Sequence, residues 1–543
     1  MLIRYLTIII ICAAFIIFPA HSQAQGYHIQ HAPIIEDFYQ QNSVQYLWLN
    51  NNGRPQQRAL TLIRHLEESW EHGLNPNIYH LNAIKTYMQD PQNAAPRFFD
   101  MLVSDAFIRY MQDLTSMRVD PNAINQDLRY WRHPLPAEYL LSTAMRSTDL
   151  DNFIQSIFPS GTLYKRLRAE LIRIYTDPES HQSLLSLDLG GRKYLKPGQI
   201  DEKLVPQLRA YFDLPPQDPA QTYLYDDYLV NEITLLQRKN FVTPDGIIGP
   251  QTLDILNRTP QDKLSQLIVN MHRLRWMDNS KPEKYILVNI PASTLWAVEN
   301  NQVKFETPVI VGRRNRPTLS FVTEVTGVRV NPTWTVPPTI KRQDYLPLLK
   351  DNPLALQNKG IRIIKDGETL DPTTIDWTTF PPNELHSLQM VQSPGPTNPL
   401  GRIRILMPNR FNIYLHDTSN PEYFAEYDRT ISSGCVRVKD PQKLADFILA
   451  ENEKWSETYV NDLLGTGRMI DIAAAQRIPV YLLYLTVWLN EDGNLTYGPD
   501  IYGWDDLLIN ALKKDNLTIP ANENTIALNS TFILDKSQNY DKL

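Results

Sequence analysis

Cysteine is the scarcest residue of this 543-residue chain, which contains only Cys12 and Cys435. Cys12 lies in an apolar amino-terminal stretch, so a chain cleaved after that stretch keeps a single thiol. A single thiol excludes an intramolecular disulfide. In an export compartment that oxidises thiols, an unpaired cysteine is best explained by its reactivity. A buried structural cysteine is the alternative.

The chain also lacks long basic runs, and its net charge is −7. Nucleic-acid binding requires a basic patch on the protein, so the sequence indicates no nucleic-acid partner. The 11 histidines show no metal-ligand spacing such as His-Glu-x-x-His. We therefore predict no metal site and no cofactor.

The amino terminus has the organisation of a secretory signal. Arg4 precedes an apolar run from Ile8 to Phe18, and Ser22-Gln23-Ala24 supplies small residues for cleavage. We predict that residues 1–24 are a signal peptide and that the mature protein is exported. An uncleaved membrane anchor is the alternative. No later apolar segment has the length needed to span a membrane.

The length exceeds that of one ordinary hydrophobic core, and we expect roughly two to four domains. Residues 25–195 are predicted to form a helical domain with a structural role, because apolar residues such as Leu60, Ile63 and Leu66 recur at helical spacing.

Residues 196–260 predict a small helical module. Pro244-Asp245-Gly246 is typical of a turn, and Gly249-Pro250 places a proline at the first position of a helix. Residues 261–282 are predicted to continue as a connecting helix.

Between residues 283 and 490 the pattern changes to strands. Runs such as Tyr285–Ile290 and Val303–Val311 are rich in branched and aromatic residues, as in a mainly antiparallel β domain. Residues 341–393 interrupt this rhythm and predict an inserted subdomain, since structureless loops of such length are uncommon. An ordinary long connection is the alternative. Residues 491–543 form a carboxy-terminal extension with one further helix.

The stretch from His416 to Arg437 carries the candidate chemistry. A free thiol with a pKa of about 8.5 is mostly protonated at neutral pH, so Cys435 needs a base to act as a nucleophile. His416 ends an alternating apolar run and can supply that base. The turn before Cys435 contains Gly434, whose missing Cβ suits a tight turn and a close approach of substrate. Its backbone N–H groups can face a developing oxyanion.

His416 followed by Ser-Ser-Gly-Cys-Val-Arg at 432–437 resembles the signature of L,D-transpeptidases, the YkuD-type cysteine enzymes of bacterial cell walls. Further blocks resemble the family in the same order: Val311-Gly312-Arg313, Asn331 to Pro338, and Pro394 to Arg402. Together they cover most of residues 283–490. A papain-type peptidase fits less well, because its cysteine precedes its histidine in the chain.

The resemblance implies a multidomain α+β architecture, as in large periplasmic Gram-negative members of the family. It implies a helical scaffold domain, a peptidoglycan-binding-like module at 196–260, and a mainly antiparallel β-sandwich catalytic domain. The module either binds the wall or serves only as a packing element. In such members the insertion at 341–393 caps the catalytic cleft as a lid. The resemblance thus places the mature protein in the periplasm.

The resemblance also implies a reaction on peptidoglycan stem peptides. Cys435 would attack the carbonyl of diaminopimelate in a tetrapeptide stem and release the terminal D-alanine. A second diaminopimelate amine would capture the thioester and form a diaminopimelate–diaminopimelate crosslink. The alternatives are L,D-carboxypeptidase activity, attachment of a lipoprotein, and a non-catalytic wall-binding scaffold. Acylation by carbapenems is expected as well.

The family orients the imidazole through the backbone carbonyl of the next residue, here Asp417, and we assign Cys435 as nucleophile and His416 as base. The N–H groups of Gly434 and Cys435 are the implied oxyanion donors. Ser433 stands where many relatives have a second histidine, and Arg437 would bind a carboxylate or brace the turn. The predicted substrate-binding residues are Tyr414, Ser433, Arg437 and Trp334.

Overall fold

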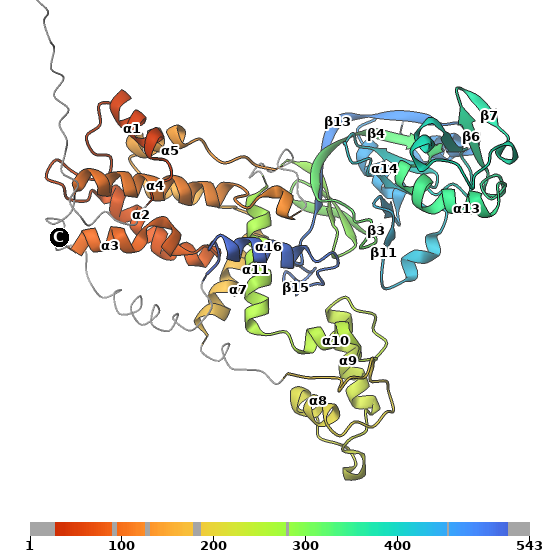
Figure 1. Cartoon of the computed structure of the whole chain (residues 1–543), viewed down its shortest axis with the longest axis horizontal. Coiled ribbons are helices and arrows are strands. Elements are labelled where there is room, and N and C mark those ends of the chain that lie inside the picture. The colour runs from red at the N-terminus through yellow and green to blue at the C-terminus, as the bar shows by residue number, and fades with distance from the viewer. Residues whose placement is uncertain are drawn as a thin grey trace, which may run out of the picture.

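A computed structural model describes residues 28–89, 95–124, 131–177, 186–277, 282–452 and 455–519. The predicted signal peptide at 1–24 and the end of the carboxy-terminal extension lie outside these ranges. Figure 1 shows the amino-terminal helices on the left, the main β-sheet on the right and a small helical module below. No helix in the described ranges is both long and apolar enough to cross a membrane.

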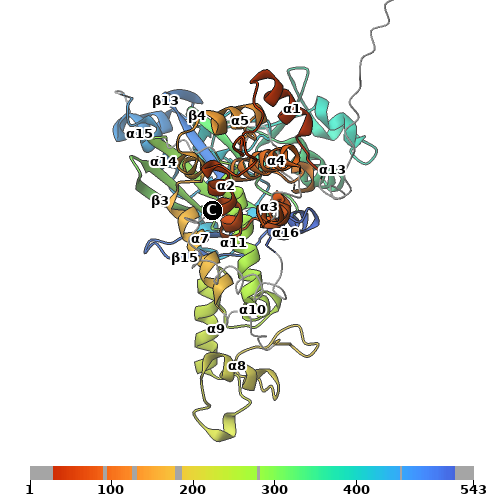
Figure 2. The same ribbon diagram turned by 90° about the vertical axis from the view of Figure 1, so that its left-hand side faces the viewer.

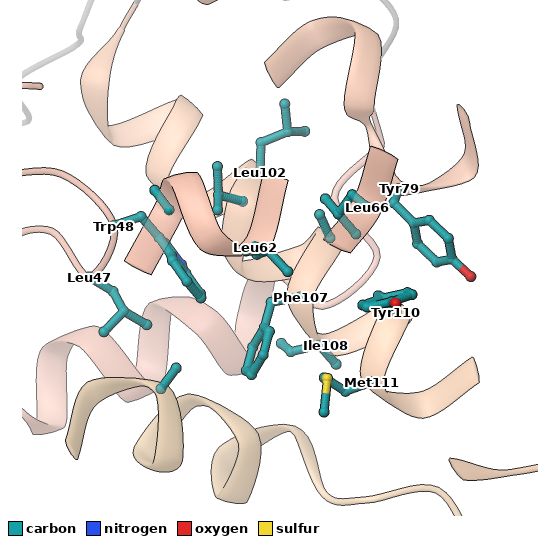
Figure 3. Close-up of a cluster of buried hydrophobic side chains, with 14 of the residues drawn as sticks. Leu47, Trp48, Leu62, Leu66, Tyr79, Leu102, Phe107, Ile108, Tyr110 and Met111 are labelled. Atoms are coloured by element: carbon teal, nitrogen blue, oxygen red, sulfur yellow. The ribbon is translucent and has the colours of Figure 1, made fainter. Parts of the chain in front are cut away.

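The amino-terminal helices pack around one central helix, α4 (Pro96–Thr115), which is buried along most of its length. Proline at its first position suits helix entry, since that residue's N–H has no partner inside the helix. Figure 3 shows Trp48 and Phe107 in this core, with ring centroids 5.4 Å apart. The surrounding helices are α1 (Ala32–Gln41), α2 (Gln57–Glu67), α3 (Leu81–Gln89), α5 (Ala137–Arg146) and α6 (Leu150–Ile157).

One carboxylate organises the polar part of this core. Asp100, fully buried on α4, accepts hydrogen bonds from the backbone N–H groups of Leu47, Trp48 and Leu49 at 2.8 to 3.0 Å. It also accepts a 2.5 Å hydrogen bond from the Tyr39 hydroxyl. Asp100 thereby fixes the segment between α1 and α2 against the central helix, and satisfies donors that would otherwise be buried without a partner.

The Asp100→Ala substitution is expected to lower the free energy of unfolding of the helical domain by about 3 kcal/mol, because several buried donors lose their acceptor. Urea unfolding followed by tryptophan fluorescence measures this loss. Asp37→Ala on the exposed side of α1 is the matched control and should change the free energy by less than about 0.5 kcal/mol. Equal stability of the two variants would contradict the role of Asp100.

The helical module contains α8 (Leu204–Phe212), α9 (Asp227–Lys239) and α10 (Pro250–Leu256). Gly246 has a φ of +70°, and its carbonyl accepts a 2.6 Å hydrogen bond from the buried Tyr225, which fixes the predicted turn. The module's core also includes Leu187 and Leu189, which the predicted boundary at 196 assigns to the scaffold domain. Figure 2 shows the module projecting away from the remaining helices.

The connecting helix α11 (Pro260–Arg275) begins at a capping box formed by Thr259 and Asp262. It packs against α7 (Thr162–Thr176) and the carboxy-terminal helix α16 (Trp504–Lys514). Arg275 is 1% exposed, and its guanidinium donates hydrogen bonds to the carbonyls of His72 and Asp113. The carboxy-terminal extension is therefore part of a core shared with α7 and α11.

The carboxy-terminal half contains a nine-stranded sheet of order β11-β3-β12-β10-β9-β4-β13-β1-β2, in which β2 also pairs with β3. The sheet thus closes on itself. Most neighbours are antiparallel, but β1–β13, β10–β12 and β11–β3 are parallel. The strands are β1 (Lys284–Asn289), β2 (Thr294–Glu299), β3 (Gln302–Gly312), β4 (Phe321–Val330), β9 (Ile403–Leu406), β10 (Leu415–His416), β11 (Thr430–Ser432), β12 (Val436–Val438) and β13 (Ile470–Leu483).

One apolar core fills the inner side of this sheet and extends to α14 (Pro441–Leu449) and α15 (Glu457–Thr466). A hairpin of β14 (Val487–Leu489) and β15 (Leu495–Tyr497) follows. Since hydrogen bonds join all nine strands in one closed sheet, the β-sandwich stays a prediction.

The predicted insertion is a folded subdomain with its own apolar core. It has a four-stranded sheet of β5 (Trp334–Thr335), β8 (Gln389–Gln392), β6 (Ile361–Lys365) and β7 (Glu368–Leu370). A helical segment runs through α12 (Pro338–Ile340), a π-helical turn at Lys341–Tyr345, and α13 (Leu346–Asp351). Its core reaches Trp334 and Leu400, beyond the predicted limits of 341–393.

Short 3₁₀ helices complete the described part of the chain. They are Glu68–His72, Pro76–Tyr79, Pro121–Ile124, Pro219–Gln221, Gln357–Lys359, Pro372–Thr374, Pro382–Ser387 and Pro421–Ala425.

Candidate active site

Two short strands bring the predicted nucleophile and base together. β10 and β12 pair in parallel, with His416 opposite Arg437 and Leu415 opposite Val436. Side chains alternate between the faces of a strand, so Leu415 and Val436 enter the core while their neighbours project from the other face. Cys435 directly precedes Val436, whose N–H donates a 2.9 Å hydrogen bond to the Tyr414 carbonyl. Cys435, Arg437, Tyr414 and His416 thus share one face at the junction of the two strands.

The imidazole of His416 is held in one orientation. Its Nδ1 lies 2.5 Å from the backbone carbonyl oxygen of Asp417, and the residue is 4% exposed. A carbonyl oxygen only accepts hydrogen bonds, so Nδ1 carries the proton and Nε2 keeps a free lone pair. Burial lowers the pKa of His416 to about 3, and the nearby Arg437 and Arg404 guanidiniums act in the same direction. His416 is therefore a neutral imidazole at physiological pH and can accept a proton at Nε2.

The Asp417 side chain braces the loop before β9 and does not contact the imidazole nitrogens. Its carboxylate accepts hydrogen bonds from the N–H groups of Arg402 at 2.8 Å and Thr418 at 2.7 Å. Gly401 has a φ of +60°, and a Cβ built there would lie 2.3 Å from the Asp417 carboxyl carbon. The missing side chain of Gly401 thus leaves the space in which Asp417 sits.

The Gly401→Ala substitution is expected to displace Asp417 and the carbonyl that orients His416. A displacement of this kind should lower the acylation rate of the site by about 10- to 100-fold. Gly395→Ala is the matched control, because a Cβ at Gly395 meets no atom within 4 Å. Intact-mass measurement of acyl-enzyme formation checks both variants, and equal rates for both would contradict this role of Gly401.

Cys435 is a free thiol, partly exposed, and its Sγ lies 3.6 Å from the backbone carbonyl of Asn412. Burial raises the pKa of the Cys435 thiol, while a hydrogen bond from the Tyr414 backbone and the guanidiniums of Arg404 and Arg437 oppose that rise. Both shifts favour a neutral thiol and a neutral imidazole in the resting site. Such a pair needs proton transfer at the moment of attack rather than a standing thiolate.

The turn before Cys435 is fixed by the Ser432 hydroxyl, which donates to the Cys435 carbonyl at 2.6 Å and accepts from the Gly434 N–H at 3.1 Å. This geometry differs from the predicted oxyanion role of Gly434, since its N–H already has a partner. Among the described residues, none accepts a hydrogen bond from the Cys435 N–H, which is thus available to an oxyanion. Gly434 has a φ of +111°, which a residue with a Cβ rarely adopts.

Residues from outside the motif hold this turn in place. The Thr318 hydroxyl donates to the Gly434 carbonyl at 2.9 Å and accepts from the Gly312 N–H at 2.9 Å. The Tyr502 hydroxyl donates to the Gly312 carbonyl at 2.6 Å and accepts from the Thr318 N–H at 3.2 Å. The carboxy-terminal extension therefore supports the turn through a buried tyrosine.

The insertion subdomain is tied to the same turn through Arg316. This guanidinium donates to the Ser433 hydroxyl at 3.1 Å and to both carboxylate oxygens of Asp344 at 2.5 and 2.7 Å. Asp344 belongs to the π-helical turn of the insertion. Ser433 thus has a positioning contact in this structure, distinct from its predicted role in binding substrate.

A cavity of about 500 Å³ lies between the insertion and the part of the main sheet formed by β12 and the loop after β10. Arg437, two positions after Cys435 in the chain, forms one wall of the cavity. The other lining residues are Tyr345, Asn358, Lys359, Gly360, Ile361, Gln392, Thr397 and Pro399 from the insertion side, and Thr418, Ser419 and Asn420 from the loop after His416.

The remaining predicted residues divide into two groups. Tyr414 lies on the face of His416, partly exposed, and the Arg404 guanidinium stacks 3.7 Å from its ring centroid. Trp334 is 8% exposed in the core of the insertion, where its ring meets that of Tyr345 edge to face. The structure brings Tyr414 to the face of His416, whereas Trp334 lies in the core of the insertion behind Tyr345, which lines the cavity.

Sequence reasoning missed several residues of the site, namely Arg404, Asn412, Ser432, Thr318, Arg316 and Tyr502. Arg404 alone had a signal in the sequence: it alternates with Ile403 and Ile405, which predicts that it projects from the face of the strand opposite the core. The others act through contacts that only the fold creates. No group of three or more His, Cys, Asp or Glu in the described ranges could hold a metal ion.

Comparisons with known proteins match two regions of the chain to known families. Residues 283–472 match the L,D-transpeptidase catalytic domain family, YkuD, and residues 33–171 match the Scaffold domain family. The chain therefore carries a YkuD-type L,D-transpeptidase catalytic domain behind a scaffold domain.

A protein of Haemophilus influenzae named "Putative L,D-transpeptidase" is 34% identical over 241 residues, which are 44% of this chain and 48% of that protein. The matched region thus spans about half the length of this relative.

Two solved structures also match. The Ldtfm–avibactam carbamoyl enzyme is 13% identical with a TM-score of 0.18, covering 37% of this chain and 49% of that chain. The L,D-transpeptidase of Xylanimonas cellulosilytica is 12% identical with a TM-score of 0.15, covering 55% of this chain and 100% of that chain.

Proposed function

We propose that this protein is a periplasmic L,D-transpeptidase that forms diaminopimelate–diaminopimelate crosslinks in peptidoglycan through a thioester on Cys435. One observation carries the proposal. Within the matched catalytic domain, a free thiol and an imidazole held through its Nδ1 lie on one face at the junction of two paired strands.

In the acylation step, the Cys435 Sγ attacks the diaminopimelate carbonyl of a tetrapeptide stem, and the thiol proton passes to Nε2 of His416. The developing oxyanion accepts a hydrogen bond from the Cys435 N–H. The bond to D-alanine then breaks, and its amine takes the proton from Nε2. A thioester on Cys435 and free D-alanine result.

In the transfer step, the side-chain amine of a second diaminopimelate attacks the thioester carbonyl and gives a proton to Nε2 of His416. The sulfur leaves and takes that proton back. The new amide is the crosslink, and the free thiol is restored. If water attacks instead, the product is a shortened tripeptide and the activity is that of an L,D-carboxypeptidase.

The architecture supports crosslinking over hydrolysis. The folded insertion is joined to the catalytic turn through Asp344 and Arg316, and it walls the cavity beside Arg437. A cavity there provides room for the second stem peptide that crosslinking requires. We propose that the insertion acts as a lid and that the module at 196–260 binds the wall.

The test is mass spectrometry of muropeptides after the purified mature protein is incubated with tetrapeptide-rich sacculi. Diaminopimelate-linked dimers, absent with the Cys435→Ala variant, are the expected result. Tripeptides without dimers would replace the proposal with a carboxypeptidase. No product from the wild-type protein, combined with binding to sacculi, would instead favour a non-catalytic wall-binding scaffold.

A further inference from the structure

A row of charged side chains crosses the face of the sheet that carries His416. In register, Arg437 on β12 is opposite His416 on β10, and His416 is opposite Arg404 on β9. Arg404 is in turn opposite Arg329 on β4, and Arg329 is opposite Asp471 on β13. Directly opposed residues on neighbouring strands project from the same face. His416 therefore lies between two arginines, Arg437 on one side and Arg404 on the other.

The arginines of this row differ in their partners. Arg329 forms two hydrogen bonds with the Asp471 carboxylate, at 2.6 and 2.7 Å, so it needs no other anion. Arg404 has no carboxylate or carbonyl within hydrogen-bonding distance among the described residues, and its buried Nε has no acceptor there. A buried N–H group without an acceptor costs free energy, and an anion that accepts a hydrogen bond from it recovers that cost.

The position of Arg404 is held by packing. Its guanidinium lies 3.7 Å from the centroid of the Tyr414 ring, a cation–π contact that keeps it flat against the strand face. Arg404 is also close enough to Cys435 to lower the pKa of the thiol. A planar, pre-oriented guanidinium of this kind suits a carboxylate.

We propose that Arg404 binds a free carboxylate of the stem peptide that reacts at Cys435, on the side of His416 away from the cavity that Arg437 walls. This inference rests on the proposed function for the identity of the ligand. Two carboxylates have the required chemistry: that of the terminal D-alanine of the donor, and that beside the attacking amine of the acceptor diaminopimelate.

The first experiment needs no turnover. Iodoacetate and iodoacetamide alkylate the Cys435 thiolate by the same displacement of iodide, but only iodoacetate carries a carboxylate. In the Arg404→Gln variant, the ratio of the iodoacetate rate to the iodoacetamide rate is expected to fall about tenfold. The ratio cancels any change in the thiolate fraction, because both reagents depend on it equally.

Two further variants sharpen the result. Arg404→Lys keeps the charge and should retain most of the ratio. Arg410→Gln removes another guanidinium that lies over an aromatic ring, 4.9 Å from the Phe411 centroid, but its side chain is exposed and outside the row. It should leave the ratio within about twofold of wild type, as surface charges are screened. A ratio unchanged in Arg404→Gln, or one that falls equally in Arg410→Gln, would overturn the proposal.

The second experiment separates the two carboxylates. Acyl-enzyme formation from a tetrapeptide is followed by intact mass, and capture of the preformed thioester by added tripeptide is followed separately. Slower acylation alone in Arg404→Gln assigns the site to the donor D-alanine, and weaker acceptor binding alone assigns it to the acceptor. Wild-type rates in both steps would overturn the proposal. If the alkylation ratio falls in Arg404→Gln but the wild-type protein makes no crosslinks, Arg404 still binds a carboxylate and only the proposed function is refuted.

Discussion

The Cys435→Ala variant is expected to lose at least about 10⁴-fold of the crosslinking rate, because no other group at the site can form the thioester. Cys435 is the free cysteine of the described residues, and the neighbouring hydroxyls already serve the turn. The intact mass of the variant should therefore show no adduct with a tetrapeptide or with a carbapenem. The wild-type protein should gain one acyl group with each.

The control for this experiment is Ser433→Ala, which changes the residue two positions earlier. It loses the 3.1 Å hydrogen bond from Arg316 but keeps the thiol. We expect its acylation rate to stay within about fivefold of wild type, since a single exposed hydrogen bond contributes about 1 kcal/mol or less. Crosslinks made by Cys435→Ala would show that a different nucleophile acts. A loss in Ser433→Ala as large as that of Cys435→Ala would show that the turn, not the thiol, limits the reaction.

The sequence supplied a candidate nucleophile and a candidate base, but not the residues that support them. His416 and Cys435 follow from residue type and from the resemblance to a known family. The supports come from elements distant in the chain, such as Thr318 and Tyr502, which reach the turn through hydrogen bonds. Such contacts have no local pattern, because neither residue type nor spacing specifies a partner so far along the chain.

The register of the short strands was equally inaccessible. β10 has two residues and β12 has three, too few for a reliable alternation in the sequence. Their parallel pairing requires a crossover connection, whose path a strand pattern does not reveal. That pairing places Arg437 and Arg404 on either side of His416, so the charged row could only be found in the structure.

Trp334 shows a different limit of sequence reasoning. A tryptophan in a strand is usually a core residue, so Trp334 was a weaker candidate for the cleft wall than Tyr414. The structure places it in the core, because β5 pairs with β8 at the other end of the insertion and encloses the ring. The length of the insertion predicted a folded unit, but its strands at 361–370 and 389–392 were not predicted.

The His416→Asn variant is expected to lower the acylation rate by about 10²- to 10⁴-fold, the usual contribution of a general base. An asparagine amide can still donate to the Asp417 carbonyl in place of Nδ1, but it offers no basic nitrogen. Intact-mass kinetics with a tetrapeptide donor measures the loss. Alkylation of Cys435 by iodoacetamide should change by less than about threefold, because the resting thiol is not ionised by the neutral imidazole. Equal losses in both reactions would indicate that His416 only supports the structure.

The pH profiles extend this test. Burial lowers the pKa of His416 to about 3 and raises that of the Cys435 thiol, so neither group titrates near pH 6.5. The iodoacetamide rate of the wild-type protein should therefore rise about tenfold per pH unit from pH 5 to 8, following the thiolate fraction. A plateau over this range would instead reveal a standing thiolate–imidazolium pair.

His416 also makes the stability of the catalytic domain depend on pH. On acidification the unfolded chain binds a proton at His416 near pH 6.5, whereas the folded chain does so only near pH 3. The free energy of unfolding therefore decreases as the pH falls from 6.5 towards 3. The stability of the His416→Asn variant should therefore fall less between pH 6.5 and pH 3 than that of the wild-type protein. This comparison tests the neutral state of the imidazole without any substrate.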